Sequence, residues 1–236
     1  MTATPSYWEA ARDVSGWLTA REGRWLHDAA RQVPAGGTIV EIGSFLGRST
    51  ICLARGAQAG ATPTPRIVAV DPHLGSPKHA HLLQCEETYA AFLANLERAG
   101  VRDVVTPRHQ TSVAAAAEFD APIDLLFIDG AHELDLVRAD FEHWFPKVRV
   151  GGRVAFHDSW HMLGPHRVTT SILLGEAPVA QPELIDTITT FVKVERRPRA
   201  ATTRHAGFVT LRALRGAAGF LRLTYRGTKM APVPTR

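Results

Sequence analysis

Acidic residues and histidines follow two apolar segments of the chain, at the points where each apolar run stops. The stretch LLFIDGAHE carries Asp129 and His132 after its apolar run, and the stretch GGRVAFHDSW carries His157 and Asp158. Carboxylates that converge in a crevice repel one another unless a cation or a proton lies between them. These residue types therefore suit general acid–base chemistry or the binding of a hard divalent ion such as Mg²⁺.

A second group of glycines and acids lies earlier in the chain. In the stretch EIGSFLGRST, Gly43 and Gly47 allow a close approach of backbone to a ligand, and Asp71 ends the later apolar run IVAVD. A carboxylate at that place can accept both hydroxyls of a ribose. The spacing G-x-x-x-G is not the dinucleotide fingerprint G-x-G-x-x-G, which favours a nucleoside without a pyrophosphate. A tight turn followed by an unrelated strand-end Asp is the alternative.

Alternating strand and helix patterns position these residues. The predicted strands cover 38–43, 66–71, 103–109, 123–129 and 152–158, with one or two more between 183 and 196, and the predicted helices cover 49–58, 85–100, 112–119 and 133–148. This alternation indicates βαβ units and a parallel sheet. Ligands bind at the carboxyl ends of strands in such sheets, so we expect both groups of residues to meet in one crevice. After the predicted strand 152–158, Pro165 favours a loop.

Composition narrows the class of protein. The 236 residues are 45% hydrophobic, which suits one sizeable domain with a core. No apolar run approaches the roughly 18–20 residues that span a bilayer, and the N-terminus lacks a signal-peptide pattern. Only two cysteines occur, so the sequence predicts a cytoplasmic protein without a disulfide framework.

Positive charge is concentrated in the last part of the chain. Residues 201–236 hold seven Arg and Lys and no acid, so the net charge of +4 leaves −3 for residues 1–200. A mildly acidic body argues against a nucleic-acid partner. The segment 206–229 predicts a basic amphipathic helix interrupted by Gly216 and Gly219. Such a tail could make a peripheral contact with a membrane surface or a glycolipid. We favour a contact between the two subunits of a homodimer.

Three segments resemble the class I S-adenosylmethionine-dependent methyltransferases: residues 16–57 around TIVEIGSFLGRST, 67–73 (IVAVDPH), and 123–158 from IDLLFIDGAHE to GGRVAFHD. The resemblance is to the branch with macrolide-sugar O-methyltransferases, actinobacterial polysaccharide O-methyltransferases and cephalosporin-biosynthesis methyltransferase-like proteins. It implies an α/β fold with a Rossmann-like, doubly wound sheet of seven mostly parallel strands, the last antiparallel. We expect a helical lid over 1–36, an S-adenosylmethionine-binding domain over 37–200 and a basic tail over 201–236.

The resemblance implies a cofactor site for S-adenosyl-L-methionine. Glu41, Gly43 and Ser44 would line the methionine and sulfonium part, and Asp71 would hold the ribose. The full set of implied cofactor residues is Glu41, Gly43, Ser44, Gly47, Ser49, Asp71, Thr111, Ser112 and Asp129, with Thr111 and Ser112 near the adenine.

The resemblance also implies a reacting side. In the family the first aspartate and a pair of acids on the next strand bind a metal, and a histidine three residues after that aspartate is the base. Asp129 and His132 match, but His157 and Asp158 stand at the acid pair. Mg²⁺ binds imidazole poorly, so Asp129, His157 and Asp158 could hold a softer divalent metal, the two carboxylates could hold Mg²⁺ alone, or no metal binds.

Some of these residues also suit simpler structural roles. His132 could cap the helix that starts after it, and Asp158 could be a plain helix N-cap. Histidines and a tryptophan crowd the neighbouring loops, and we expect His73, Trp160 and His161 to contact the acceptor. The long stretch 71–84 is predicted to form a substrate lid.

The sequence therefore predicts a metal-assisted O-methyltransferase that acts on a hydroxyl of a sugar, a polysaccharide precursor or a small natural product. Its catalytic residues would be His132 and Asp129, and its partner would be a small-molecule hydroxyl acceptor. Three alternatives stay open: a metal-independent N-methyltransferase, an RNA-modifying or nucleic-acid-binding protein that uses the basic tail, and a non-catalytic homologue that binds only the cofactor.

Overall fold

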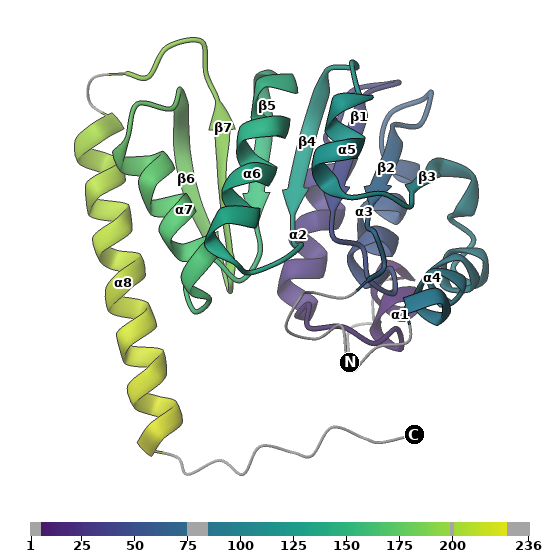
Figure 1. Ribbon diagram of the computed structural model, residues 1–236, viewed down its shortest axis with the longest axis horizontal. Helices are drawn as coiled ribbons and strands as arrows, with labels where there is room; N and C mark the ends of the chain where they lie inside the picture. Colours follow the sequence, from purple (N-terminus) through teal and green to yellow (C-terminus); the bar gives the residue numbers. More distant parts are fainter. Residues whose placement is uncertain (1–5, 75–84, 199–200, 226–236) are drawn as a thin grey trace.

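One seven-stranded sheet organises the chain, in the order β3-β2-β1-β4-β5-β7-β6. The structure is a computed structural model that describes residues 6–74, 85–198 and 201–225 (Figure 1). The strands are β1 (Thr38–Ile42), β2 (Arg66–Val70), β3 (Val105–Arg108), β4 (Ile123–Ile128), β5 (Val148–Phe156), β6 (Val179–Ile185) and β7 (Ile188–Lys193). Among these described strands, only the pairs made by β7 are antiparallel, which confirms the predicted α/β sheet with its antiparallel last strand.

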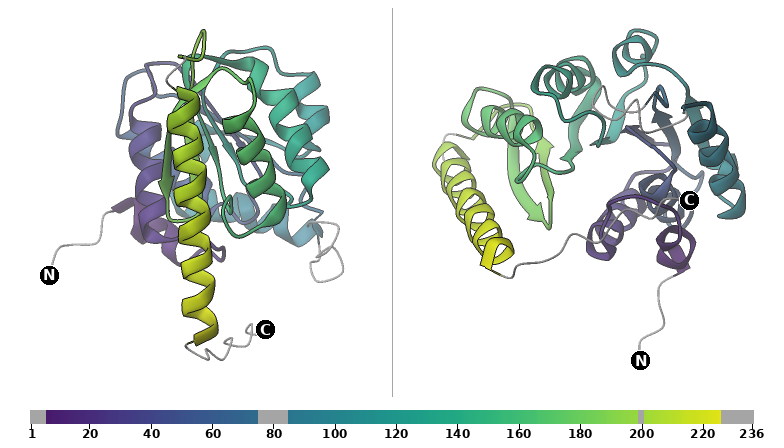
Figure 2. Two further views of the ribbon diagram at one scale, coloured as in Figure 1. Left: turned by 90° about the vertical axis from the view of Figure 1, so that its left-hand side faces the viewer. Right: turned by 60° about the horizontal axis from the view of Figure 1, so that its bottom comes forward.

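Helices cover both faces of this sheet, as Figures 1 and 2 show. They are α1 (Ser6–Arg12), α2 (Ala20–Arg31), α3 (Arg48–Gln58), α4 (Cys85–Arg98), α5 (Ser112–Ala117), α6 (Leu134–Trp144), α7 (Leu163–Leu174) and α8 (Ala201–Tyr225), with short 3₁₀ turns at Arg102–Val104 and Phe145–Lys147. One apolar core joins the sheet to α1–α4, and a second joins it to α5–α7. This is the doubly wound arrangement that the family resemblance implies, built from the βαβ units that the alternating pattern predicts.

The central strands β1 and β4 are buried along their whole length. Ile39 packs into the core with α1–α4 and its neighbour Val40 into the opposite core, because successive side chains of a strand point to opposite faces. Continuous apolar runs are the expected signature of strands covered on both faces. The polar residues that follow β1 and β4 are therefore forced to the carboxyl edge of the sheet.

The segment after β5 is a helix, so the predicted loop there is wrong. Helix α7 begins at Leu163, which puts Pro165 at its third residue. The first-turn N–H groups of a helix have no intrahelical partner, so a proline there costs no hydrogen bond. The strand β5 also begins at Val148 rather than at 152.

The basic tail forms one continuous helix, α8, that runs without a break past Gly216 and Gly219, so the predicted interruption is wrong. Its first half packs against α7 and β6, and its far end extends beyond the sheet (Figures 1 and 2). Among the described residues, none of the helices is long and apolar enough to cross a membrane. The homodimer and the division into three regions stay predictions.

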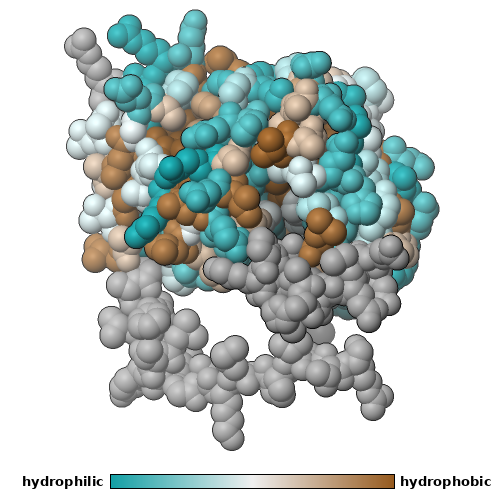
Figure 3. Space-filling model, in the orientation of Figure 1, coloured by the Kyte–Doolittle hydropathy of each residue, from teal (hydrophilic) through white to brown (hydrophobic). Residues whose placement is uncertain are grey.

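Arg212 of α8 is a buried cation that ties the tail to the body. Its guanidinium donates to the hydroxyls of Thr169 and Thr170 in α7 and of Thr189 in β7, at 2.7, 2.5 and 3.1 Å. Burial lowers the pKa of Arg212 to about 10. On the coloured surface of the molecule in Figure 3, polar and apolar residues are interspersed.

We expect Arg212→Ala to lower the free energy of unfolding by about 2–4 kcal/mol, because it leaves a void and removes charge-assisted hydrogen bonds. Thermal unfolding followed by circular dichroism measures this. Arg204→Ala, at an exposed position of the same helix, is the control and should be neutral. Equal melting temperatures for the two variants would contradict the docking of α8 through Arg212.

Candidate active site at the carboxyl edge of the sheet

Asp71, directly after β2, organises the loop between β1 and α3. Its Oδ2 accepts the backbone N–H groups of Ser44 and Phe45 at 2.9 and 2.8 Å, and its Oδ1 accepts that of His73 at 2.6 Å. Phe45 and His73 have φ of 44° and 50°, a left-handed conformation that non-glycine residues rarely adopt. Strained backbone of this kind is found at ligand sites, and here one carboxylate holds it.

Two glycines let the chain pass closely at this edge. Gly43 has φ of 85°, and a Cβ there would lie 2.3 Å from the carbonyl oxygen of Asp129. Gly47 has φ of 92° and is the N-cap of α3, with no side-chain cap. The ends of β1 and β4 thus meet at Gly43. The first N–H groups of α3, which have no intrahelical partner, follow shortly after it in the chain.

Glu41 and Ser49 face one another inside the protein. The carboxyl group of Glu41 is fully buried, and the hydroxyls of Ser49 and Thr50 lie 2.5 Å from its two oxygens. Burial raises the pKa of Glu41 to about 8. These hydrogen bonds hold α3 against β1, so we expect Glu41 and Ser49 to shape the loop between β1 and α3. Ser44, by contrast, has a buried hydroxyl without a hydrogen-bond partner among the described residues, which leaves it free to bind a ligand.

Glu41→Gln should change how stability depends on pH. Because the folded-state pKa of about 8 exceeds the ordinary value of 4.5, folding takes up a proton between these values, and the free energy of unfolding falls as pH rises through that range. The glutamine variant should lack this fall and be about 2–4 kcal/mol more stable than wild type at pH 8. Urea unfolding at pH 5 and pH 8 measures it, with the exposed Glu97→Gln as control. Parallel pH dependences in wild type and variant would contradict the buried-acid assignment.

The two residues implied near the adenine begin helix α5. Thr111 is its N-cap, exposed, with its hydroxyl accepting the N–H of Ala114. The hydroxyl of Ser112 accepts the indole N–H of Trp144 at 2.9 Å. Ser112 is therefore engaged between α5 and α6, and Thr111 is the more accessible of the pair.

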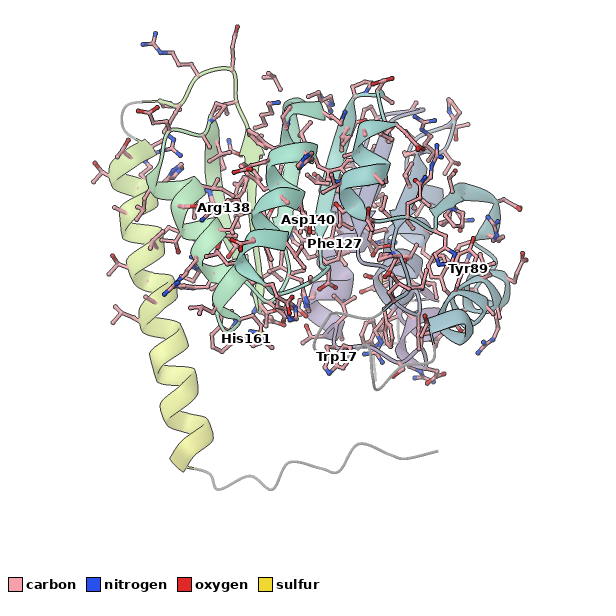
Figure 4. The ribbon with its side chains drawn as sticks, in the orientation of Figure 1. Trp17, Tyr89, Phe127, Arg138, Asp140 and His161 are labelled. Carbon is pink, nitrogen blue, oxygen red and sulfur yellow. The ribbon has the colours of Figure 1, made fainter. Side chains whose placement is uncertain are left out.

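His73 lies apart from the other two residues predicted to contact an acceptor. It is buried after β2, with its ring near those of Tyr89 and His109, and its Nδ1 has no hydrogen-bond partner within the described ranges. Trp160 and His161 follow β5, three strands away in the sheet. Figure 4 shows Tyr89 and His161 toward opposite sides of the view. His73 thus belongs with Asp71, on the side implied for the nucleoside; most of the predicted lid, 75–84, lies outside the described residues.

On the other side, Asp129, His132 and Asp158 converge. The Nε2 of His132 lies 3.1 Å from Oδ2 of Asp158, and one ligand atom from each of the three residues can be chosen so that all lie within 4.8 Å of one another. His161 approaches the same acid, with Nε2 3.2 Å from Oδ1 of Asp158. Asp158 itself has a left-handed φ of 53°. Two neighbouring strand ends, β4 and β5, bring these residues together as the sequence predicts.

His157 is placed differently from a metal ligand. Its Nδ1 lies 2.9 Å from Oδ1 of Asp129, and its Nε2 lies 3.4 Å from Oε2 of Glu22, so each ring nitrogen faces a carboxylate. Asp158 adds a third carboxylate oxygen at 3.4 Å. Burial alone would lower the pKa of His157, but these carboxylates, Asp129 foremost, raise it far above its usual range. The prediction that His157 binds a metal stays a prediction; in this geometry both of its ring nitrogens face carboxylates.

These contacts set the charges of the site. Burial raises the pKa of Asp129, although the charge of His157 and its hydrogen bond act to lower it. Burial acts the same way on Asp158, but hydrogen bonds from His132 and His157 dominate and hold its pKa well below the usual range. The hydrogen bond to Asp158 raises the pKa of His132. Three carboxylates, those of Glu22, Asp129 and Asp158, thus surround the ring of His157, and Asp158 also faces His132.

Glu22 belongs to this cluster although the sequence does not predict it there. It lies in α2, far from the strand ends in sequence, and its side chain is fully buried. The capping-box pattern Thr19-x-x-Glu22 is readable in the sequence, but it explains only one of the contacts of that carboxylate. Its approach to His157 arises from the packing of α2 against the sheet.

Comparisons with known proteins agree on one family. A family model described as a methyltransferase domain matches residues 40–159. The chain is 30% identical over 185 residues to a catechol O-methyltransferase of Mycobacterium tuberculosis, covering 72% of this chain and 74% of that protein. It is 35% identical over 146 residues to an uncharacterized protein of Sinorhizobium fredii, covering 61% of this chain but only 15% of that protein.

Solved structures share the fold. An O-methyltransferase from Bacillus cereus, in complex with SAH, superposes with a TM-score of 0.58 at 20% sequence identity. The likeness covers 82% of this chain and 93% of that one. At this identity it supports the fold and leaves the substrate open.

Proposed function

Because the chain belongs to the class I S-adenosylmethionine-dependent methyltransferase family, we propose that it transfers the methyl group of S-adenosylmethionine to a hydroxyl oxygen. The observation that carries the proposal is the convergence of Asp129, His132 and Asp158 at the strand ends beside the loop held by Asp71. A sulfonium methyl group is already activated, whereas a neutral hydroxyl is a poor nucleophile that needs a base.

The cofactor would lie over the loop between β1 and α3. Asp71 keeps lone pairs beyond its three backbone contacts, and these can accept the ribose hydroxyls. The buried hydroxyl of Ser44 and the N-terminus of α3 offer further hydrogen bonds. Gly43 lets the ends of β1 and β4 approach closely beside this loop.

His132 would act as the base. The nearby carboxylate of Asp158 stabilises the imidazolium that forms when the ring takes the hydroxyl proton. As that proton leaves, the acceptor oxygen bonds to the methyl carbon, the bond from carbon to sulfur breaks, and its electron pair returns to the sulfur. The products are a methyl ether and S-adenosylhomocysteine.

The oxygens of Asp129 and Asp158 would hold a divalent ion, with His157 outside its ligands. Such an ion would supply positive charge that lowers the pKa of a bound hydroxyl. Two carboxylates together with water would suit Mg²⁺, which leaves the imidazole of His132 free to act as the base.

The proposed acceptor is a small molecule with adjacent hydroxyls. A divalent ion on two convergent carboxylates would favour an acceptor that chelates it with a pair of oxygens. Both a sugar diol and a catechol present such a pair. Catechol is the substrate that the name of the Mycobacterium tuberculosis relative gives, and a sugar is what the sequence resemblance implies. Trp160, half-buried beside His161, offers a flat surface for either ring.

Removal of divalent ions tests the role of the aspartates. With EDTA we expect methyl transfer to fall at least about tenfold and to recover when Mg²⁺ or Mn²⁺ is added back. S-adenosylhomocysteine release measures the rate, and calorimetric titration of that nucleoside, expected to be unaffected by EDTA, is the control. An unchanged rate in EDTA would contradict metal assistance and favour the metal-independent N-methyltransferase.

A further inference from the structure

Glu22 is a buried acid that the proposed reaction does not use. Its carboxylate is fully buried, although it lies in the first turn of α2 as the acid of a capping box. A buried charge is costly unless every oxygen is compensated. The partners of Glu22 therefore indicate what it does.

Both oxygens of Glu22 accept hydrogen bonds from two directions. Oε1 accepts the N–H and the hydroxyl of Thr187 at 2.8 and 2.6 Å. Oε2 accepts the N–H of Thr19 at 2.9 Å and faces Nε2 of His157 at 3.4 Å. An amide in place of the carboxylate would turn its NH₂ toward one of these donors. The site is thus built for a carboxylate, and its hydrogen bonds lower the pKa of Glu22 to about 2 against the effect of burial.

Three distant segments meet at this carboxylate. Thr19 is the N-cap of α2, Thr187 lies in the turn between β6 and β7, and His157 directly follows β5. Asp186 in the same turn accepts from the hydroxyl of Thr19 at 2.8 Å and from Arg21 at 3.0 Å. The start of α2 is consequently fixed against the last hairpin, and Glu22 reaches from this junction into the active site.

We propose that Glu22 is a positioning residue: it holds the ring of His157 so that Nδ1 faces Asp129 and aims the Asp129 carboxylate into the site. His157 is only 4% exposed, so water cannot replace a lost carboxylate partner. Without Glu22, the buried Nε2–H would lack its acceptor and the ring would turn toward Asp158 instead. This inference rests on the proposed methyl transfer, where Asp129 orients the acceptor.

The test compares Glu22→Gln, His157→Gln and the double variant with wild type. Loss of a group that orients a ligand costs roughly 10–100-fold in activity, so we expect kcat to fall by that factor in Glu22→Gln. The KM for S-adenosylmethionine and the Kd for S-adenosylhomocysteine should stay within about twofold of wild type. The double variant should be no slower than His157→Gln alone, because Glu22 acts through that ring.

Thr19→Ala is the matched control. It removes the side-chain cap from the same helix start and leaves the contact between Glu22 and His157 in place. We expect its kcat to stay near wild type. If Thr19→Ala lowers kcat as much as Glu22→Gln, or if the effects of Glu22→Gln and His157→Gln multiply, Glu22 is only a structural residue and the proposal is overturned.

A readout without turnover separates this inference from the proposed function. The hydrogen-bonded ring N–H of His157 should give a downfield proton resonance, assigned by its loss in His157→Gln. Glu22→Gln and the shorter Glu22→Asp should shift or abolish it, and Thr19→Ala should keep it. A resonance unchanged in both Glu22 variants overturns the proposal even if wild type is active. If the Glu22 variants show these shifts but the wild type shows no methyl transfer, the proposed function is refuted instead.

Discussion

His132→Ala should lower kcat by about 10²–10⁴-fold, the usual contribution of a positioned general base, while S-adenosylhomocysteine binds as in wild type. The imidazole lies 3.1 Å from Asp158, on the side of the site away from Asp71, so its loss should not disturb the nucleoside. Single-turnover kinetics and calorimetric titration measure the two quantities. Loss of nucleoside binding would contradict the assignment of His132 as the base.

The pH dependence of the same variant gives a second check. Because Asp158 raises the pKa of His132 above its ordinary 6.5, the ring becomes neutral, and able to accept a proton, only at higher pH. We expect the rate of wild type to rise with pH on the alkaline side of 6.5. In His132→Ala that rise should be absent, and exposed His143→Ala should keep it.

Asp71→Asn should weaken the binding of S-adenosylhomocysteine about a hundredfold or more. Hydrogen bonds to a charged group contribute roughly 1.5–3 kcal/mol each, and the amide loses both the charge and one accepting oxygen. The same change also removes an acceptor from the N–H groups of Ser44, Phe45 or His73, which shape the loop. Exposed Asp135→Asn is the matched control. Nucleoside affinity equal to that of the control would place the cofactor elsewhere.

The sheet was predictable from the sequence because its strands are short, apolar and regularly separated by helical patterns. β1 and β4 begin at the predicted residues and end one residue before the predicted ends. Helix α7 was not predictable from Pro165 alone, since the effect of a proline depends on which turn of the helix it occupies. The continuity of α8 likewise depends on packing, which outweighs the weak helix propensity of two glycines.

The candidate site was predictable as a set of strand-end residues but not as a network. Adjacent strand ends bring Asp129 and Asp158 together, and this follows from the order of elements. The surroundings of His157 do not follow, because they include Glu22, which is 135 residues away in the chain. Metal ligation by His157 is implied only by its place at the acid pair of the resembling family, and the two carboxylates that face its ring nitrogens could not be read from that pattern.

Methyl transfer to oxygen is the central claim, and the most direct test supplies the protein with S-adenosylmethionine carrying a deuterated methyl group. Sugar diols and catechols serve as acceptors, Mg²⁺ is present, and products are identified by mass spectrometry. The account predicts a labelled methyl ether from at least one acceptor, formed by wild type and lost in His132→Ala. A label found only on nitrogen, or a wild type that fails to bind the nucleoside at all, would contradict it.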